Sequence, residues 1–367
     1  MKPLESSNSL FAPGKVFLAG EYAVLEPGWP ALVLATARGL HADVAPLPRG
    51  EVELVHGPSR VALLGELHPE RGIAWAMPVP DELRFAAQAA ALAARLCAEE
   101  GLSQRGFQLT FLDDLAVESP RGKVKLGLGG SACATVLAVR ATALAQERLM
   151  PKAEVLALAH AAHWAAQEGA GSGADVAACA YGGALEVVAK AAWDSPQEVL
   201  ALPARALLED RRAFAAPFEL PVEARFLLAW SGVCADTRAL VREVRAFGAA
   251  RPARLAHHAE AIAFCAESLK AALDADSAKT ALTALRRAAV AMAALGEEAG
   301  CAIVTPELAR ICAIAARAGC AGKPSGAGGG DCAIVLCFGD EARDRVKAAL
   351  AAADVFSFPL EVAPPTE

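Results

Sequence analysis

The strongest constraint on the fold of this chain is a glycine-rich run at 127–132 with the sequence GLGGSA. Glycine lets a backbone adopt positive φ angles and pass close to a ligand. Residues 133–140 are compatible with a helix, and a helix N-terminus offers free N–H groups and the positive end of a dipole. The run therefore predicts an anion site, most often one for phosphate, made by Gly127, Leu128, Gly129, Gly130, Ser131 and Ala132.

A second glycine-rich loop lies near the other end of the chain, at 323–332, with the sequence KPSGAGGGDC. Two such loops far apart in the sequence suggest two walls of one site for a polyanion. The Walker pattern GxxxxGK[ST] is absent, so nucleotide chemistry needs another architecture. The first loop also matches the dinucleotide fingerprint GxGxxA, but the elements around it do not read as a βαβ unit, which argues against an oxidoreductase.

Composition narrows the class of protein. With 367 residues, 55% of them hydrophobic, the chain has core material for one large or two ordinary domains. A formal net charge of −7 argues against a general nucleic-acid surface. No apolar run reaches membrane-spanning length, and residues 1–9 lack the apolar region of a secretion signal. The ten cysteines include no CxxC pair and read as small buried hydrophobes, so a reducing, cytoplasmic setting is expected.

The order of the expected elements predicts an α+β fold, because strands and helices mix without strict βαβ alternation. A change of character at 193–203 predicts two lobes, 1–192 and 193–367. Strands are expected at 11–18, 31–36, 40–45, 51–56, 61–64, 107–112, 183–189, 225–230, 331–338 and 355–362. Helices are expected at 81–101, 131–149, in a segment ending at about 168, and at 254–275, 278–296, 306–318 and 341–352.

Two charged residues stand in unusual surroundings. Lys15 lies inside an apolar strand, where a charge is costly unless it serves an anion or a carboxylate; a solvent-facing position at a strand edge is the alternative. Asp175 lies among glycines and alanines at the start of a helical turn, where it is either a helix cap or an acid that orients a hydroxyl proton during phosphoryl transfer. A nearby Lys15 would keep Asp175 ionised.

A pair of histidines is interpreted as structural. His160 and His163 are three residues apart on an expected helix and could share a face. No third residue at a suitable spacing completes a zinc site, so packing is favoured over metal binding.

Taken together, three segments resemble the GHMP kinase superfamily, which is named after galactokinase, homoserine kinase, mevalonate kinase and phosphomevalonate kinase. The segments are PGKVFLAGEYAV at 13–24, GLGGSA at 127–132 and KPSGAGGGDC at 323–332, in the family's order and across nearly the whole chain. The chain is most similar to the phosphomevalonate kinases. Tyr22 stands where mevalonate kinases tend to carry histidine, Asp331 stands where they tend to carry glycine, and GSGADVAA at 171–178 also resembles that subfamily.

This resemblance implies a two-lobed fold with the site in the cleft. The N-terminal lobe would be like the second domain of ribosomal protein S5, and the C-terminal lobe ferredoxin-like. Residues 127–132 would wrap the phosphates of ATP, Ser131 would help to hold Mg²⁺, and Lys15 and Asp175 would act at the acceptor, expected to be phosphomevalonate. The chain would be a monomer or homodimer. Expected acceptor-binding residues are Lys15, Tyr22, Lys125, Ser172, Asp175, Ser325, Gly326, Ala327 and Gly328.

Some details stay open at this level. Lys125 is a candidate cation near the glycine loops, as is Lys323, but Lys125 also fits a solvent-facing strand residue. Gly130 replaces a serine that is common in the family. The glutamate that ligates Mg²⁺ in mevalonate kinases would fall near Trp164, which cannot ligate, so ATP and water are expected to supply most of the coordination. A mevalonate kinase, a diphosphomevalonate decarboxylase and a ligand sensor built on an inactive kinase remain alternatives.

Overall fold

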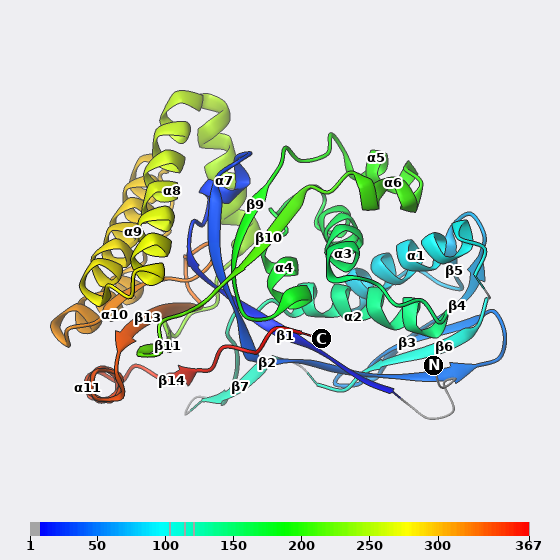
Figure 1. Ribbon diagram of the computed structural model, residues 1–367, viewed down its shortest axis with the longest axis horizontal. Coiled ribbons are helices and arrows are strands. Elements are labelled where there is room, and N and C mark those ends of the chain that lie inside the picture. Colours follow the sequence, from blue (N-terminus) through cyan, green and yellow to red (C-terminus); the bar gives the residue numbers. More distant parts are fainter. Residues whose placement is uncertain (1–7, 103, 114, 120–121, 367) are drawn as a thin grey trace.

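The computed structural model describes residues 8–366 apart from 103, 114 and 120–121, and it has two lobes that lie side by side (Figure 1). The residues before position 8, for which we expected no secretion signal, lie outside the described part. The larger lobe is built from β1 (Asn8–Ala19), η1 (Ala23–Leu25), β2 (Pro30–Leu47), β3 (Glu51–His56), β4 (Val61–His68), β5 (Gly72–Trp75), η2 (Asp81–Leu83), α1 (Arg84–Glu99), β6 (Gly106–Phe111), β7 (Ala116–Ser119), β8 (Gly122–Lys125), α2 (Gly130–Ala145), α3 (Lys152–Ala166), α4 (Ala174–Tyr181), β9 (Ala184–Ala189), α5 (Pro196–Ala201), α6 (Ala204–Glu209) and β10 (Ala213–Phe218).

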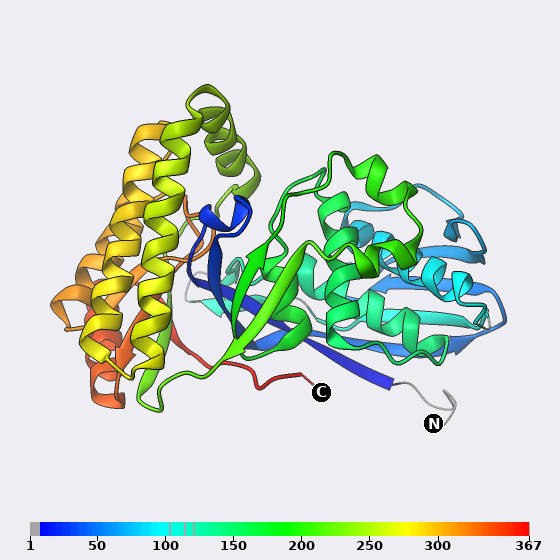
Figure 2. The ribbon, with the colours of Figure 1, turned by 45° about the horizontal axis from the view of Figure 1, so that its top comes forward.

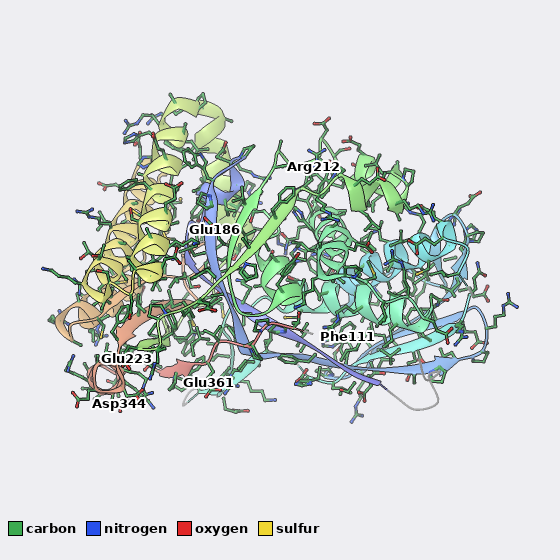
Figure 3. All side chains as sticks on the ribbon, in the orientation of Figure 1. Phe111, Glu186, Arg212, Glu223, Asp344 and Glu361 are labelled. Carbon is green, nitrogen blue, oxygen red and sulfur yellow. The ribbon has the colours of Figure 1, made fainter. Side chains whose placement is uncertain are left out.

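Most strands of this lobe form one sheet in the order β10-β9-β2-β6-β3-β4-β5, with β1 antiparallel to β2. Helices α1 to α4 lie together on one face of the sheet (Figure 2). Strand β6 shows why this face is buried, because Phe107, Leu109 and Phe111 alternate along it and all point into the core. Figure 3 shows Phe111 between the strands and these helices. Helices α2 and α3 are buried over most of their surface, as expected for helices that are apolar all round.

The smaller lobe has the ferredoxin-like topology that the resemblance implied. Its four strands lie in the order β12-β13-β11-β14, and every neighbouring pair is antiparallel. In chain order this is a β-α-β-β-α-β arrangement with additional helices after the first strand. The elements are β11 (Ala224–Trp230), α7 (Thr237–Ala250), α8 (Pro252–Asp274), α9 (Ala278–Ala299), α10 (Pro306–Arg317), β12 (Ala321–Pro324), β13 (Cys332–Phe338), α11 (Asp340–Ala351) and β14 (Ser357–Leu360).

The two lobes share a hydrophobic core. Alternate residues of β11 and β13 point to opposite faces of the small sheet. Leu227 and Val335 pack in the cluster that includes residues of α10 and α11, whereas Leu228 and Ile334 join a cluster with α8 and α9. That second cluster also contains Leu18 of β1, so it is continuous with the large sheet. The α+β expectation is therefore confirmed, and the lobes are packed against each other through apolar side chains.

The division of the lobes at residues 192/193 stays a prediction. Two segments that lie after this position nevertheless hydrogen-bond to the larger lobe. Strand β10 follows that position but pairs with β9 of the large sheet along its whole length. The segment after β14 returns to the larger lobe, where the Ala363 N–H donates to the carbonyl of Ala35 and the Thr366 N–H to that of Tyr181. By hydrogen bonding, the smaller sheet begins at β11.

Several elements differ from the expectation. The strands expected at 31–36 and 40–45 are one long strand, β2, which continues through Gly39. A Cβ atom at Gly39 would lie 2.1 Å from the carbonyl oxygen of Ala12, so glycine here permits the close approach of β1 rather than a break. Helix α7 and strands β10 and β12 were not predicted. Within the described residues, no helix is both long enough and apolar enough to cross a bilayer.

A buried ion pair connects the two lobes beside this shared core. Lys323, in β12, is completely buried and pairs with Glu21, which follows β1 and is only 3% exposed. The Lys323 ammonium also donates to the carbonyl of Pro324 at 2.5 Å, and the Gly326 N–H donates to Glu21 Oε1 at 3.2 Å. Burial lowers the pKa of Lys323, while the charge of Glu21 opposes that shift. Each charge is tolerable here only because the other is present.

We predict that Lys323→Met destabilises the protein by about 3–5 kcal/mol, because it leaves the Glu21 carboxylate buried without its counter-charge. Glu21→Gln in the same chain should restore more than half of that loss, since it removes the orphaned charge. Urea unfolding followed by circular dichroism measures both. A double variant no more stable than Lys323→Met would contradict this account.

Candidate active site

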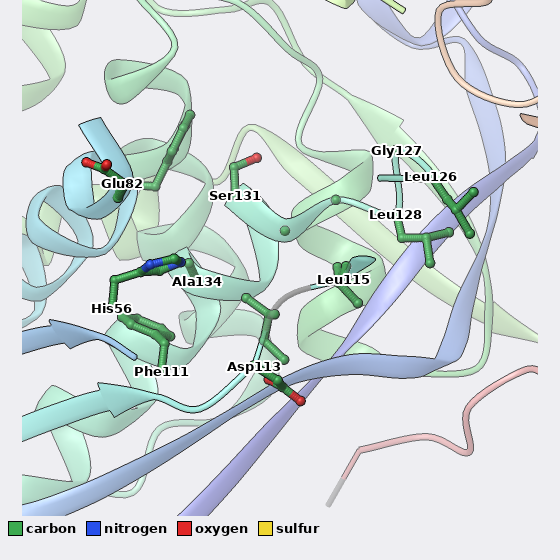
Figure 4. Close-up of a pocket in the computed structure, with 14 residues that line it drawn as sticks. His56, Glu82, Phe111, Asp113, Leu115, Leu126, Gly127, Leu128, Ser131 and Ala134 are labelled. Atoms are coloured by element: carbon green, nitrogen blue, oxygen red, sulfur yellow. The ribbon is translucent and has the colours of Figure 1, made fainter. Parts of the chain in front are cut away.

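Two cavities meet at the first glycine loop, and Gly127 lines both. One has a volume of about 310 Å³ and is lined by residues 126–131 together with apolar residues such as Phe85, Leu115 and Ala134. Its polar walls include His56, Glu82 and Asp113 (Figure 4). The other has a volume of about 420 Å³ and lies between the two glycine loops, with Lys15 and Asp175 in its wall. The predicted pairing of the two loops around one site is thus seen in the structure.

The conformation of the first loop requires glycine at position 129 but not at position 130. Gly129 has a φ of 85° and ends the loop at the start of α2. A Cβ atom at Gly129 would lie 2.9 Å from Cγ of Lys15, so both the φ angle and the packing require glycine. A Cβ atom at Gly130 would meet only Leu115, at 3.9 Å. The residue that departs from the family pattern is therefore not required by the backbone.

Lys15 is held against the same loop. Its N–H donates to the carbonyl of Leu128 at 2.8 Å, and its ammonium donates to the carbonyl of Gly127 at 3.0 Å. The Lys15 side chain is half-buried and lines the larger cavity. Its charge therefore lies at the boundary between the two cavities.

Asp175 lies at the first turn of α4, beside this lysine. Gly173, with a φ of 77°, precedes the helix, and Asp175 Oδ1 accepts from the N–H of Val176 at 2.9 Å. Burial alone would raise the pKa of Asp175, but His163, Lys15 and the Val176 N–H outweigh it and lower the pKa below its usual value. Burial also lowers the pKa of His163, which leaves its ring neutral at neutral pH. The effect of His163 on Asp175 requires a charged ring, so at neutral pH Lys15 and the Val176 N–H are the groups that favour the ionised carboxylate.

Two side-chain hydroxyls connect the second glycine loop to β1 and to the turn that follows β1. Ser325 Oγ accepts from the N–H of Phe17 at 2.9 Å and donates to the carbonyl of the same residue at 3.0 Å. The hydroxyl of Tyr22 donates to the carbonyl of Ala327 at 2.5 Å, and burial raises its pKa, so it stays neutral. Both hydroxyls therefore make contacts within the protein. Tyr22, Ser325, Gly326, Ala327 and Gly328 all line the larger cavity.

The remaining expected residues fall in different places. Ser172 is buried in the wall of the larger cavity, and its Oγ accepts from the N–H of Ala174 at 3.4 Å. Lys125 ends β8, and its side chain lies outside the described part of the structure. Lys323 pairs with Glu21 inside the core and does not line the cavity, contrary to its expected place near the acceptor. Its charge serves the junction between the lobes.

Three arginines that sequence reasoning missed line the same cavity. Arg238, Arg242 and Arg245 lie on α7 at spacings that place them on one helix face. Within the described residues, none of them forms an ion pair with a carboxylate, and Arg245 donates to the carbonyl of Gly169 at 3.3 and 3.4 Å. The i, i+4, i+7 spacing was visible in the sequence. This spacing indicates a shared face only if residues 237–250 form a helix, and no helix was predicted there.

Asp331 lies between the first loop and the segment before α7. It has a φ of 48°, its Oδ1 accepts from the N–H of Ala235 at 3.2 Å, and its own N–H donates to the carbonyl of Val233 at 2.7 Å. A Cβ atom on Gly127 would lie 2.6 Å from Oδ2 of Asp331. Burial raises the pKa of Asp331. Asp331, which follows the triple glycine, thus holds the loop 231–236. Helix α7 with its three arginines begins directly after this loop.

Two models of one protein family match this chain. Residues 86–183 match the model for the GHMP kinases N terminal domain, and residues 268–355 match that for GHMP kinases C terminal. The chain is 32% identical over 352 residues to the phosphomevalonate kinase of Streptomyces sp. (strain CL190). This match covers 91% of this chain and 90% of that relative.

Solved structures have the same fold. The Lin0012 protein from Listeria innocua matches with a TM-score of 0.85 and 25% identity, over 99% of this chain and 100% of that one. Streptococcus pneumoniae phosphomevalonate kinase in complex with phosphomevalonate and AMPPNP matches with a TM-score of 0.78 and 21% identity, over 96% and 99% of the two chains. The protein belongs to the GHMP kinases. The superfamily expected from the three motifs is confirmed, and the chain is a kinase that resembles phosphomevalonate kinases.

We predict opposite effects for two neighbouring glycines. Gly129→Ala should destabilise the protein by about 1–3 kcal/mol, because it forces an alanine into positive φ and against Lys15. Gly130→Ala should be neutral or stabilising by up to about 1 kcal/mol, because alanine is the better helix residue and meets open space. Urea midpoints at constant m-value decide this. Equal destabilisation by both substitutions would show that the loop differs from the one described.

Proposed function

We propose that the protein is a phosphomevalonate kinase, which transfers the γ-phosphoryl group of ATP to the phosphate of (R)-5-phosphomevalonate to form 5-diphosphomevalonate. The observation that supports this acceptor is the cationic wall of the larger cavity. Lys15 lines this cavity together with Arg238, Arg242 and Arg245 of α7, and carboxylates such as Asp175 and Asp331 line it too. An acceptor with both a phosphate and a carboxylate needs several cations, and arginine binds both groups through paired hydrogen bonds.

The smaller cavity is assigned to ATP. Its glycine loop leads into the N-terminus of α2, where the free N–H groups and the dipole favour phosphate. The apolar side chains of Phe85, Leu115 and Leu126 offer a surface for a nucleobase. Because Gly127 lines both cavities, the γ-phosphate would lie where the acceptor's phosphate arrives. Such a placement is what phosphoryl transfer requires most, since positioning and charge neutralisation dominate its catalysis.

Magnesium is the expected ionic partner of ATP, and the residues of the site fit that role. Within the described residues, no three His, Cys, Asp or Glu side chains gather into a metal cluster. Mg²⁺ usually keeps water and phosphate ligands and takes only one or two oxygens from the protein. Ser131, on the first turn of α2 and in the wall of the cavity assigned to ATP, would supply such an oxygen. When bound, the cation would neutralise charge on the transferred group.

The roles of the chain's own residues follow from charge. Lys15 offers a positive charge to the transferred group from between the two cavities. The attacking oxygen belongs to a phosphate and is already largely ionised near neutral pH. A general base is therefore hardly needed, and we assign Asp175 to orienting Lys15 and the acceptor. The three arginines of α7 line the cavity assigned to the acceptor, where they would select a substrate with two anionic groups.

Removing one arginine should weaken acceptor binding without affecting ATP. We expect Arg242→Ala to raise KM for phosphomevalonate about tenfold or more, because a charge-assisted hydrogen bond contributes about 1.5–3 kcal/mol. KM for ATP should change less than twofold. Arg287→Ala, an exposed arginine on α9 away from the cavity, is the matched control. Equal effects of both substitutions on KM for phosphomevalonate would reject the assignment of α7.

Asp175→Asn separates positioning from proton removal. We expect kcat to fall by no more than about 100-fold, less than the upper end of the roughly 10²–10⁴ that general-base catalysis contributes. The pKa of Asp175 is lowered, so the group stays ionised from pH 8 down to pH 5. An acidic limb near pH 6 in kcat/KM should come from the acceptor's phosphate and persist in Asp175→Asn. Disappearance of that limb in the variant, or complete loss of turnover with ligand binding intact, would assign the proton to Asp175.

The overall assignment is tested by ADP release with Mg·ATP and each of mevalonate, phosphomevalonate and diphosphomevalonate. Phosphomevalonate should have the highest kcat/KM by at least an order of magnitude. A preference for mevalonate would make the protein a mevalonate kinase, and CO₂ release from diphosphomevalonate would make it a decarboxylase. Binding of phosphomevalonate with no turnover of any acceptor would indicate a sensor.

A further inference from the structure

We propose that His163 is a positioning residue, which accepts the hydroxyl proton of Ser131 and so turns the lone pairs of Ser131 Oγ toward the cation bound with ATP. A serine that ligates a metal ion must direct its own proton elsewhere. This inference rests on the proposed ATP site, but not on which acceptor the enzyme uses.

The contacts of one ring nitrogen carry the proposal. His163 Nε2 lies 3.1 Å from Ser131 Oγ and 3.1 Å from the side-chain nitrogen of Gln167. It also lies 3.9 Å from Oδ2 of Asp175, which is too far for a hydrogen bond. Three polar groups of the site thus converge on a single atom of a side chain that is only 2% exposed.

These contacts fit the tautomer that carries hydrogen on Nδ1. In that tautomer the single lone pair of Nε2 is the acceptor that the Ser131 hydroxyl and the Gln167 amide nitrogen share. The carboxylate of Asp175 lies 3.9 Å from the same nitrogen, beyond hydrogen-bond distance. With hydrogen on Nε2, that nitrogen would donate, and Ser131 could not direct its proton there.

The ring is held so that this orientation cannot relax. His163 is buried on α3, its ring centroid lies 5.0 Å from that of Phe85, and Gln167 follows one helical turn later. Ser131 lines the ATP cavity, whereas Gln167 and Asp175 line the acceptor cavity. His163 lies behind both and touches the polar groups that face each ligand. Packing alone would explain a buried ring there, but not the convergence of donors on one nitrogen.

The first measurement uses the unaltered protein. Nitrogen-15 chemical shifts of the His163 ring, assigned by its absence in His163→Phe, report which nitrogen carries hydrogen. We expect a protonated Nδ1 and a bare Nε2 in the ligand-free protein near pH 7.5. A hydrogen on Nε2 would overturn the proposal, and this result needs neither folding of a variant nor any substrate.

The second measurement concerns the cation. His163→Phe keeps an aromatic ring against Phe85 but removes the acceptor, so we expect affinity for Mn²⁺·ATP, followed by electron paramagnetic resonance, to fall about tenfold. Affinity for metal-free ATP should change less than twofold. In the Ser131→Ala background the same substitution should have almost no further effect, because His163 acts through that hydroxyl. Independent, additive losses would assign His163 a structural role.

A kinetic readout separates positioning from stability. His163→Phe should lower kcat while KM for the acceptor stays within about twofold, and His163→Gln, whose amide oxygen can accept, should recover part of kcat. Equal loss in both variants would contradict the proposal. If the acceptor proves to be mevalonate, the proposed function fails, yet the nitrogen-15 and Mn²⁺ results still decide the role of His163.

Discussion

Both glycine loops are hydrogen-bonded to the same strand within two residues of each other, and the architecture of the site depends on this. At Lys15, β1 receives the first loop through the carbonyl of Leu128, and at Phe17 it receives the second through the hydroxyl of Ser325. Loops nearly two hundred residues apart are thus brought into register by one extended segment. Strands position side chains more precisely than loops do, and the lysine between the two cavities lies on such an element.

This arrangement also gives the buried ion pair its place. The turn after β1 brings Glu21 beneath the second loop, where it pairs with Lys323 and accepts from Gly326. A buried pair contributes little net stability compared with apolar residues, since both charges lose their water. It does, however, specify a single alignment of the lobes, because any slip would leave one charge alone in a low-dielectric core. The shared apolar cluster provides the attraction between the lobes, and the ion pair determines their register.

The parts of the fold that sequence reasoning recovered are those with local signals. Both glycine loops, Lys15, Asp175 and, in the smaller lobe, strands β11, β13 and β14 and helices α8 to α11 follow from short motifs and periodicity. Helix α7 was not predicted, although Leu240, Val244 and Phe247 recur at helical spacing and are buried. The position of its arginines at a cavity could not be predicted, because distant segments form the rest of that cavity. Lys323 was misplaced for the same reason: its partner Glu21 lies some three hundred residues away. The contact between His163 and Ser131 was not predicted, because nothing along the chain shows that the two residues lie across from each other.

The open space at Gly130 offers experimental access to the site. Its missing side chain would point past Leu115 into the wall of the smaller cavity, without contact to the backbone of the loop. Of the ten cysteines, Cys234 is exposed and the others are buried or half-buried. A cysteine at position 130 in a chain that lacks Cys234 would therefore carry a fluorophore at the wall of the smaller cavity. The same gap lets this loop accept a side chain next to the cavity while its backbone stays in place.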